Sequence, residues 1–255
     1  MNHMPCACGV PELQPRSVLA PGAALEISRQ EAEQICDALN AHFSANLEFH
    51  AVDAERWVAR FGTDCEVNAT SSFEAAGRDF DPIGAGRGHA LLNEIQMLLH
   101  AHPVNEAREA RGEPPINGLW LWGAGRARKA SSRWNSVLAN EPIAMGLAML
   151  AGTRYRSLPA SAQPWLEGAP EEGRHLVVLD ALRVPAALDD VVSYEKNLNA
   201  LEAAWFAPLL RALRAGRIGV VTVHVPDAAE AVSFETVRGD LRRFWRRPKT
   251  LASYS

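Results

Sequence analysis

The sequence has few cysteines, a small net charge and no long apolar stretch. Its 255 residues include 4 Cys and 3 Tyr, and the formal net charge is -4. Four cysteines in a chain of this length exclude a disulfide framework. No stretch approaches the roughly 20 apolar residues that a membrane span needs, so we expect no association with a membrane.

The N-terminus also lacks the features of a targeting sequence. Residues 1–21 read MNHMPCACGVPELQPRSVLAP, with several prolines and no basic region followed by an apolar run. We therefore expect neither a signal peptide nor a transit peptide, and a cytoplasmic location. The same composition predicts that residues 1–25 are a flexible tail.

The remaining composition is that of a folded protein, with 47% hydrophobic and 22% charged residues. A capping box at Ser28 and Glu31 starts an apolar stripe of helical period, which predicts a helix over 29–45. Two short β-like runs follow, at 47–52 and 56–61. Together they predict a small α+β module over residues 26–87, with a loop from residue 62 onward.

Residues 88–255 are predicted to form an α/β domain. Pro103 separates two helical stretches, and the apolar run 116–122 leads into a glycine turn, as a buried strand does. Alternating strands and helices then favour a sheet with parallel pairs between residues 116 and 225. The later elements are expected at 142–151 (helix), 176–179 (strand), 193–215 (helix) and 218–223 (strand).

Basic residues are concentrated at the C-terminus. Residues 238–255 carry five Arg and one Lys against Asp240, which leaves the rest of the chain at about -9. The segment could bind nucleic acid or an anionic surface. We favour a basic terminal helix that docks through Leu241, Phe244 and Trp245 and keeps its arginines in water, so nucleic acid is not an expected partner.

Two groups of residues could bind a small anion. Gly123 and Gly125 allow backbone amides to approach a phosphate, and Arg126 could pair with it. Asn105, Arg108 and Asn117 could hold a phosphate or carboxylate through directed, charge-assisted hydrogen bonds. For each group the alternative is structural, as a glycine turn or as caps at the Pro103 break.

The candidates for a metal centre are sparse. Cys6 and Cys8 form a lone C-x-C, and Asp180, His224 and Asp227 follow or end predicted strands. These side chains fall short of the ligand count of a hydrolytic metal centre, and no G-x-S-x-G nucleophile elbow is present. We therefore predict no metal and no cofactor.

Several segments, in order, resemble the archaeal-type cofactor-independent phosphoglycerate mutases of the alkaline-phosphatase superfamily. The match includes a signature of the form H-P-V-N…R…G…P-x-N…G-x-G. The segments are ISRQEAE (27–33), HPVN (102–105) with Arg108 and Gly112, PINGLWLWGAG (115–125) and PIAMGLAMLAG (142–152).

The strings LLNEIQMLLHAHPVNEAREARG, NGLWLWGAGR and WFAPLLRALRAGR are also similar to a bacterial RpfE-type regulatory protein family. The two resemblances imply a truncated alkaline-phosphatase-like sheet with helices on both faces, with residues 26–87 as the mutase insert.

The resemblance also implies what activity would require. Active mutases have an N-terminal strand ending in an Asp-Gly metal motif, a phosphorylatable Ser, and later metal motifs rich in His and Asp. Nothing before Leu25 is expected to supply that strand or nucleophile. We therefore expect a non-catalytic regulatory protein that binds a small phosphorylated or carboxylated metabolite. The alternative is a metal-dependent mutase or phosphatase using Asp180, His224 and Asp227.

Overall fold

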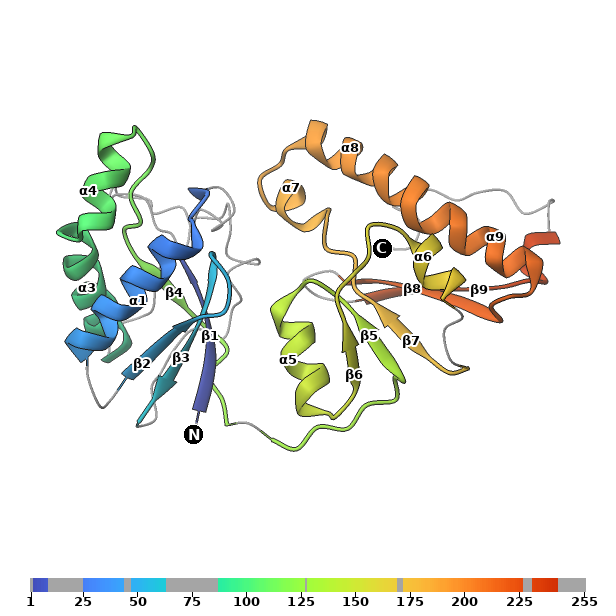
Figure 1. Ribbon diagram of the computed structural model, residues 1–255, viewed down its shortest axis with the longest axis horizontal. Coiled ribbons are helices and arrows are strands. Elements are labelled where there is room, and N and C mark those ends of the chain that lie inside the picture. The colour runs from blue at the N-terminus through green and yellow to red at the C-terminus, as the bar shows by residue number, and fades with distance from the viewer. Residues whose placement is uncertain are drawn as a thin grey trace.

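The computed structural model describes residues 2–8, 25–43, 47–62, 87–126, 128–168, 172–226 and 231–242. Figure 1 shows two halves side by side, joined by a long segment that leaves β4 (Leu119–Leu121) and enters β5 (Ser136–Leu138). The first half has one buried hydrophobic cluster, and the second half has two. No helix in these described ranges is long and apolar enough to cross a membrane.

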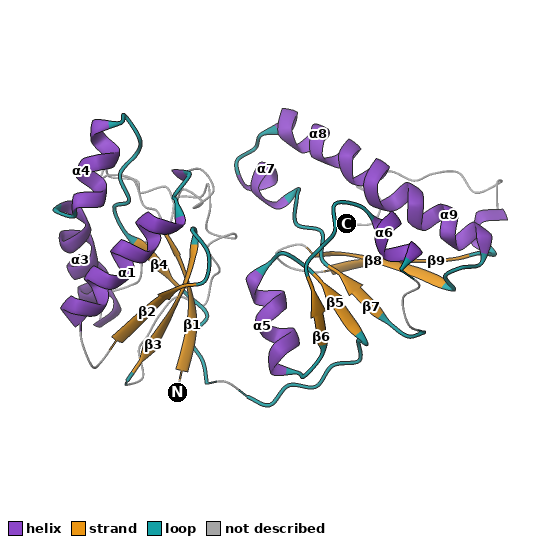
Figure 2. Cartoon of the chain, viewed as in Figure 1, coloured by secondary structure: helices purple, strands orange, loops and turns teal. Residues whose placement is uncertain are grey.

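The first half is a four-stranded sheet with helices packed against it (Figure 2). The strand order is β2-β3-β1-β4, and every neighbouring pair is antiparallel. Its elements are β1 (Asn2–Cys8), α1 (Arg29–Phe43), β2 (Leu47–Ala51), β3 (Arg56–Phe61), α3 (Arg87–His100), α4 (Pro103–Ala110) and β4 (Leu119–Leu121).

Local sequence signals explain how α1, β2 and β3 form. The predicted capping box is confirmed: the Ser28 backbone amide donates to Glu31 Oε2 at 2.8 Å, and the Glu31 amide donates to Ser28 Oγ at 3.2 Å. The expected stripe is buried at Ala32, Ile35, Cys36 and Leu39. The turn between β2 and β3 is closed by Asp53, which accepts hydrogen bonds from the amides of Glu55 and Arg56.

Asn2–Cys8 lie within the predicted tail of residues 1–25, and the structure places them in β1 between β3 and β4. The strand carries Pro5, and proline is rare in a central strand because it cannot donate a ladder hydrogen bond. The pairing partners of β1 lie far along the sequence, so no local pattern indicates it. Residues 9–24 lie outside the described ranges.

The core of the first half crosses the expected boundary between residues 87 and 88. Leu92, Ile95 and Leu99 of α3 are buried in the same cluster as Ile35 and Leu39 of α1. Residues of α3, α4 and β4 complete this core. The predicted division between the α+β module and the α/β domain at residue 87 therefore runs through one hydrophobic core. The residues between 63 and 86, expected as loop, lie outside the described ranges.

The second half contains a parallel three-stranded sheet, in the order β6-β5-β7. Leu176 and Val178 pack in one cluster with α5, whereas Val177 and Leu179 pack in another with α6 and α9, so helices cover both faces. The elements are β5 (Ser136–Leu138), α5 (Pro142–Leu150), β6 (Arg154–Arg156), α6 (Ala162–Glu167), β7 (His175–Val177), α7 (Arg183–Ala187), α8 (Val191–Leu201), the π-helix η3 (Glu202–Phe206) and α9 (Ala207–Ala215).

A separate antiparallel hairpin, β8 (Val220–Pro226) and β9 (Ala231–Val237), follows α9. The predicted run of parallel pairs between residues 116 and 225 is therefore wrong for β4 and β8. The described strands form three small sheets instead of the single expected sheet. After β9, Asp240–Arg242 form a short 3-10 helix, η4. The rest of the predicted basic terminal helix lies outside the described ranges.

Candidate functional site

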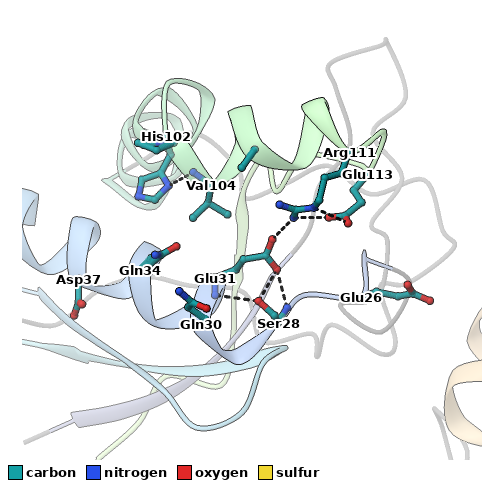
Figure 3. A pocket seen from close by; sticks show the side chains of 12 residues that line it. Glu26, Ser28, Gln30, Glu31, Gln34, Asp37, His102, Val104, Arg111 and Glu113 are labelled. Atoms are coloured by element: carbon teal, nitrogen blue, oxygen red, sulfur yellow. Dashed lines mark hydrogen bonds and ion pairs between the residues drawn. The ribbon is translucent and has the colours of Figure 1, made fainter.

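A groove of about 840 Å³ lies between the start of α1 and the segment around α4 (Figure 3). Two of the segments that carry the sequence resemblance meet here, although they are far apart along the chain. The groove is lined by Glu26, Ser28, Gln30, Glu31, Gln34, Asp37, His102, Pro103, Val104, Ala107, Arg111 and Glu113.

The Glu31 carboxylate joins the two sides of the groove. Its Oε2 accepts hydrogen bonds from Ser28 and from Arg108 Nη1 (3.2 Å), and its Oε1 accepts from Arg111 Nη2 (2.7 Å). Burial acts to raise the pKa of Glu31. The hydrogen bonds from Ser28 and the charge of Arg108 outweigh burial, and the pKa is lowered. Glu31 is therefore a structural anion, ionised at neutral pH.

Arg108 is fully buried and is used by the fold. Its guanidinium donates to the carbonyls of Leu25 and Pro114, as well as to Glu31. These acceptors all belong to the protein, and a contact of Arg108 with a bound ligand stays a prediction. A buried guanidinium needs internal acceptors, and here they come from Glu31 of α1, from Leu25 just before α1 and from Pro114 just after α4.

Asn105 is also occupied within the protein. Its amide nitrogen donates to the carbonyls of Leu99 and Ile116, and its Oδ1 accepts from the Ile116 amide at 2.7 Å. These bonds join the end of α3 to the chain that enters β4. Asn105 thus has the structural role that was considered as the alternative, and its contact with a ligand stays a prediction.

His102 caps α4 with its imidazole ring, as the structural alternative expected. Nδ1 accepts the Val104 amide at 3.2 Å, and burial lowers the pKa of the ring. A ring that accepts at Nδ1 is neutral and carries its proton on Nε2. His102 is thus a neutral donor at the edge of the groove (Figure 3).

The groove is unsuited to a phosphate or carboxylate ligand. Its charged lining residues are the acidic Glu26, Glu31, Asp37 and Glu113 and the basic Arg111. Arg111 is itself paired with Glu113 and Glu31. This excess of carboxylates repels an anion.

The remaining predicted anion ligands lie at the two ends of β4. Asn117 precedes the strand, whereas Gly123, Gly125 and Arg126 follow it in an exposed loop. Gly123 has a φ of +69°, and among the described residues, apart from its chain neighbours, no heavy atom lies within 4 Å of a Cβ placed on Gly125. This loop gives backbone amides room to approach an anion, whereas Asn117 lies at the opposite end of β4.

A second polar cluster lies where β5 and β7 end; of its members, the sequence singled out Asp180 and none of the others. Glu141 caps α5 through the Ala144 amide (2.8 Å) and pairs with Arg56 at 2.6 Å. Arg183 lies 4.0 Å from Glu141 and 3.6 Å from Asp180. Burial and the charge of Arg56 lower the pKa of Arg183. Arg56 belongs to the first half and Glu141 to the second, so this pair joins the halves.

The candidate metal ligands are not assembled into a centre. Asp180 pairs with Arg183, and His224 Nδ1 lies 2.7 Å from Ser233 Oγ across the β8–β9 hairpin. Asp227 lies outside the described residues. Within the described part of the chain, no group of three or more His, Cys, Asp and Glu side chains could hold a metal ion.

The fold and these sites define a mixed α/β protein with a signature segment built into its core. The chain is homologous, at low identity, to 2,3-bisphosphoglycerate-independent phosphoglycerate mutases. It is 24% identical over 241 residues to the enzyme of Methanosarcina acetivorans, covering 84% of this chain. It is 32% identical over 75 residues to a probable mutase of Geobacter sulfurreducens, which covers 27% of this chain and 19% of that protein. No family model matches.

A solved structure of the cofactor-independent phosphoglycerate mutase from Thermoplasma acidophilum aligns with a TM-score of 0.39 and 17% identity. The alignment covers 93% of this chain and 67% of that one. The chain spans 60% of the length of the Methanosarcina acetivorans mutase.

Proposed function

We propose that this chain is a phosphoglycerate-mutase-like protein of the RpfE regulatory type, acting in the cytoplasm without turnover and binding a small phosphorylated or carboxylated metabolite. The homology to the mutases supports the scaffold. The regulatory and ligand-binding parts rest on how this chain uses its charged side chains.

One observation carries the non-catalytic part: each carboxylate at the carboxyl ends of β5 and β7 has an arginine beside it. Glu141 follows β5 and pairs with Arg56, and Asp180 follows β7 and lies beside Arg183. In open parallel sheets this edge is where ligands bind. A carboxylate already neutralised by an arginine is a poor metal ligand and a poor general base, because the pair must first be broken.

The ligand-binding part rests on the exposed loop after β4. Gly123 and Gly125 leave the backbone accessible, and Arg126 adds a guanidinium beside it. Backbone amides and a guanidinium form charge-assisted hydrogen bonds to phosphate or carboxylate oxygens. The acidic groove beside α1 has the opposite charge and is not part of this proposal.

Calorimetric titration of the full chain with 3-phosphoglycerate and with inorganic phosphate tests the ligand. We expect Arg126→Ala to weaken binding about 10-fold or more, as the loss of a charged hydrogen bond does. Arg211→Ala, which removes an exposed arginine of α9, is the matched control. Absence of binding, or equal binding by both variants, contradicts the proposed site.

The alternative is a metal-dependent mutase or phosphatase. The observation in its support is that 84% of this chain aligns with a mutase. A mutase assay and a phosphatase assay with added Mn²⁺ separate the two readings. Turnover that requires Mn²⁺ and disappears in Asp180→Asn replaces the regulatory proposal. We expect no turnover in either assay.

A further inference from the structure

The segment that joins the two halves is strongly basic. Residues 114–140 contain no Asp or Glu, and within them Arg126, Arg128, Lys129 and Arg133 are all exposed. Figure 1 shows this segment passing outside both halves between β4 and β5. Four cations in eight residues, in a chain of net charge -4, concentrate positive potential on one stretch of surface.

The parallel sheet brings two further arginines to the end of this segment. Ser136, the first residue of β5, lies opposite Arg154 of β6 on one side and His175 of β7 on the other. The strands are parallel, so their first residues share one edge of the sheet, about 5 Å apart from strand to strand.

Arg174 is fixed at the same edge by its backbone. The Asn135 amide donates to the Arg174 carbonyl at 2.7 Å, and the Arg174 amide donates to Asn135 Oδ1 at 2.8 Å. The Arg154 and Arg174 side chains are exposed. We call Arg126, Arg128, Lys129, Arg133, Arg154 and Arg174 the basic edge.

An aromatic ring lies within the basic edge. The Arg133 guanidinium lies 4.8 Å from the centre of the half-buried Trp134 ring, next to the start of β5. Cations that track a phosphate backbone, together with an aromatic ring on which a base can stack, are the two parts of a surface for single-stranded nucleic acid. Five of the six cations are arginines, whose planar donors suit phosphate oxygens better than an ammonium does.

We propose that the basic edge binds single-stranded nucleic acid, mainly through its phosphates. The proposal does not depend on the small-ligand site, because five of its six cations, all but Arg126, are outside the Gly123–Arg126 loop. It also differs from the C-terminal segment that the sequence suggested as a nucleic-acid patch. The sheet topology assembles this surface from three separate parts of the chain.

Fluorescence anisotropy of a labelled single-stranded oligonucleotide of about 20 nucleotides, titrated with the full chain at several salt concentrations, tests the proposal. We expect binding that weakens as salt rises. Arg128→Ala/Lys129→Ala and Arg133→Ala/Arg174→Ala should each weaken binding about 10-fold. Each should also reduce the slope of log affinity against log salt by about 1.4, or about 0.7 per phosphate contact.

Arg211→Ala/Arg214→Ala, on exposed positions of α9, removes the same charge elsewhere and should leave affinity within about two-fold, because it removes no phosphate contact. Circular dichroism checks that all variants keep their helix content. The proposal is overturned by absence of binding at low salt, or by equal losses in the edge and control variants. It is also overturned if polyglutamate displaces the labelled oligonucleotide as effectively as the unlabelled oligonucleotide does. That result would indicate an acidic protein as the partner.

Discussion

Arg108 and Glu31 lie 77 residues apart in the sequence, and their side chains meet with 3.2 Å between Nη1 and Oε2. The Arg108 side chain is 1% exposed and that of Glu31 is 13% exposed. This pair holds the N-terminal end of α1 against α4. The pair gives the arginine of the signature segment a structural role that requires no ligand.

We expect Glu31→Gln to lower the free energy of unfolding by about 1–3 kcal/mol, because it leaves the buried Arg108 charge with Glu113, 3.5 Å away, as its remaining counter-ion. Urea unfolding followed by circular dichroism measures the change. Glu33→Gln is the matched control: it breaks a pair with Arg29 whose side chains are about half exposed or more, and should cost under about 0.5 kcal/mol. Equal losses in the two variants would contradict a structural role for Glu31.

The same pair predicts how stability depends on pH. The pKa of Glu31 is lowered in the folded protein, so its contribution is present above the unfolded pKa of about 4.3 and is lost as pH falls through the folded pKa. Unfolding measured between pH 7 and pH 3 should show a steeper acid loss in the wild type than in Glu31→Gln. Parallel curves would show that other carboxylates account for the acid limb.

Arg56 and Glu141 predict a change in the separation of the halves. Glu141→Gln keeps an oxygen to cap the Ala144 amide but loses the charge that pairs with Arg56. We expect a larger radius of gyration by small-angle X-ray scattering, with helix content unchanged. Glu48→Gln breaks a pair with Arg60 inside the β2–β3 hairpin and should leave the radius of gyration as it was. An unchanged radius in both variants would show that the pair does not hold the halves together.

Cys36 should be unreactive in the folded protein. Burial, with the charge of Asp37, raises the pKa of its thiol to about 12, so almost none is thiolate at pH 8. Iodoacetamide labelling followed by peptide mass mapping should leave Cys36 unmodified in the native chain and modify it fully in denaturant. Rapid native labelling would place the thiol outside the core.

Two glycines predict stability changes of opposite sign. Gly216 ends α9 with a φ of +75°, and a Cβ there would meet Arg238 at 3.2 Å, so Gly216→Ala should cost about 1 kcal/mol. Gly146 lies exposed inside α5, and no other described part of the chain comes within 4 Å of an added Cβ, so Gly146→Ala should stabilise by about 0.5–1 kcal/mol. Thermal unfolding measures both, and shifts of the same sign would contradict these backbone assignments.

The sequence predicted the helices well and the sheets less well. The capping box at Ser28 and the break at Pro103 are local signals, and they lie where α1 and α4 begin. The strand β9 was missed although its alternation is visible in AVSFETV, where exposed and half-buried residues alternate. No comparable pattern exists for β1, because its hydrogen bonds are made with β3 and β4 far along the chain.

The candidate sites divide in the same way. Asn105 and Arg108 were predicted as candidate ligand-binding residues. Their partners in the structure, Ile116 and Glu31, were not predicted. Sequence spacing places residues on an element; it does not say whether a guanidinium faces a ligand or the core. Whether the Gly123–Arg126 loop binds an anion stays a prediction.

The sequence by itself determined the helices, the capping box and the composition of a folded α/β chain, since helix periods and caps are decided by residues a few positions apart. Only the tertiary structure decided which charged residues form pairs within the fold and which remain on the surface. It buried Arg108 against Glu31, set Glu141 beside Arg56, and gathered Arg133, Arg154 and Arg174 on one edge. Those pairings join distant parts of the chain, and their stability depends on burial and charge, which exist only once the core is formed.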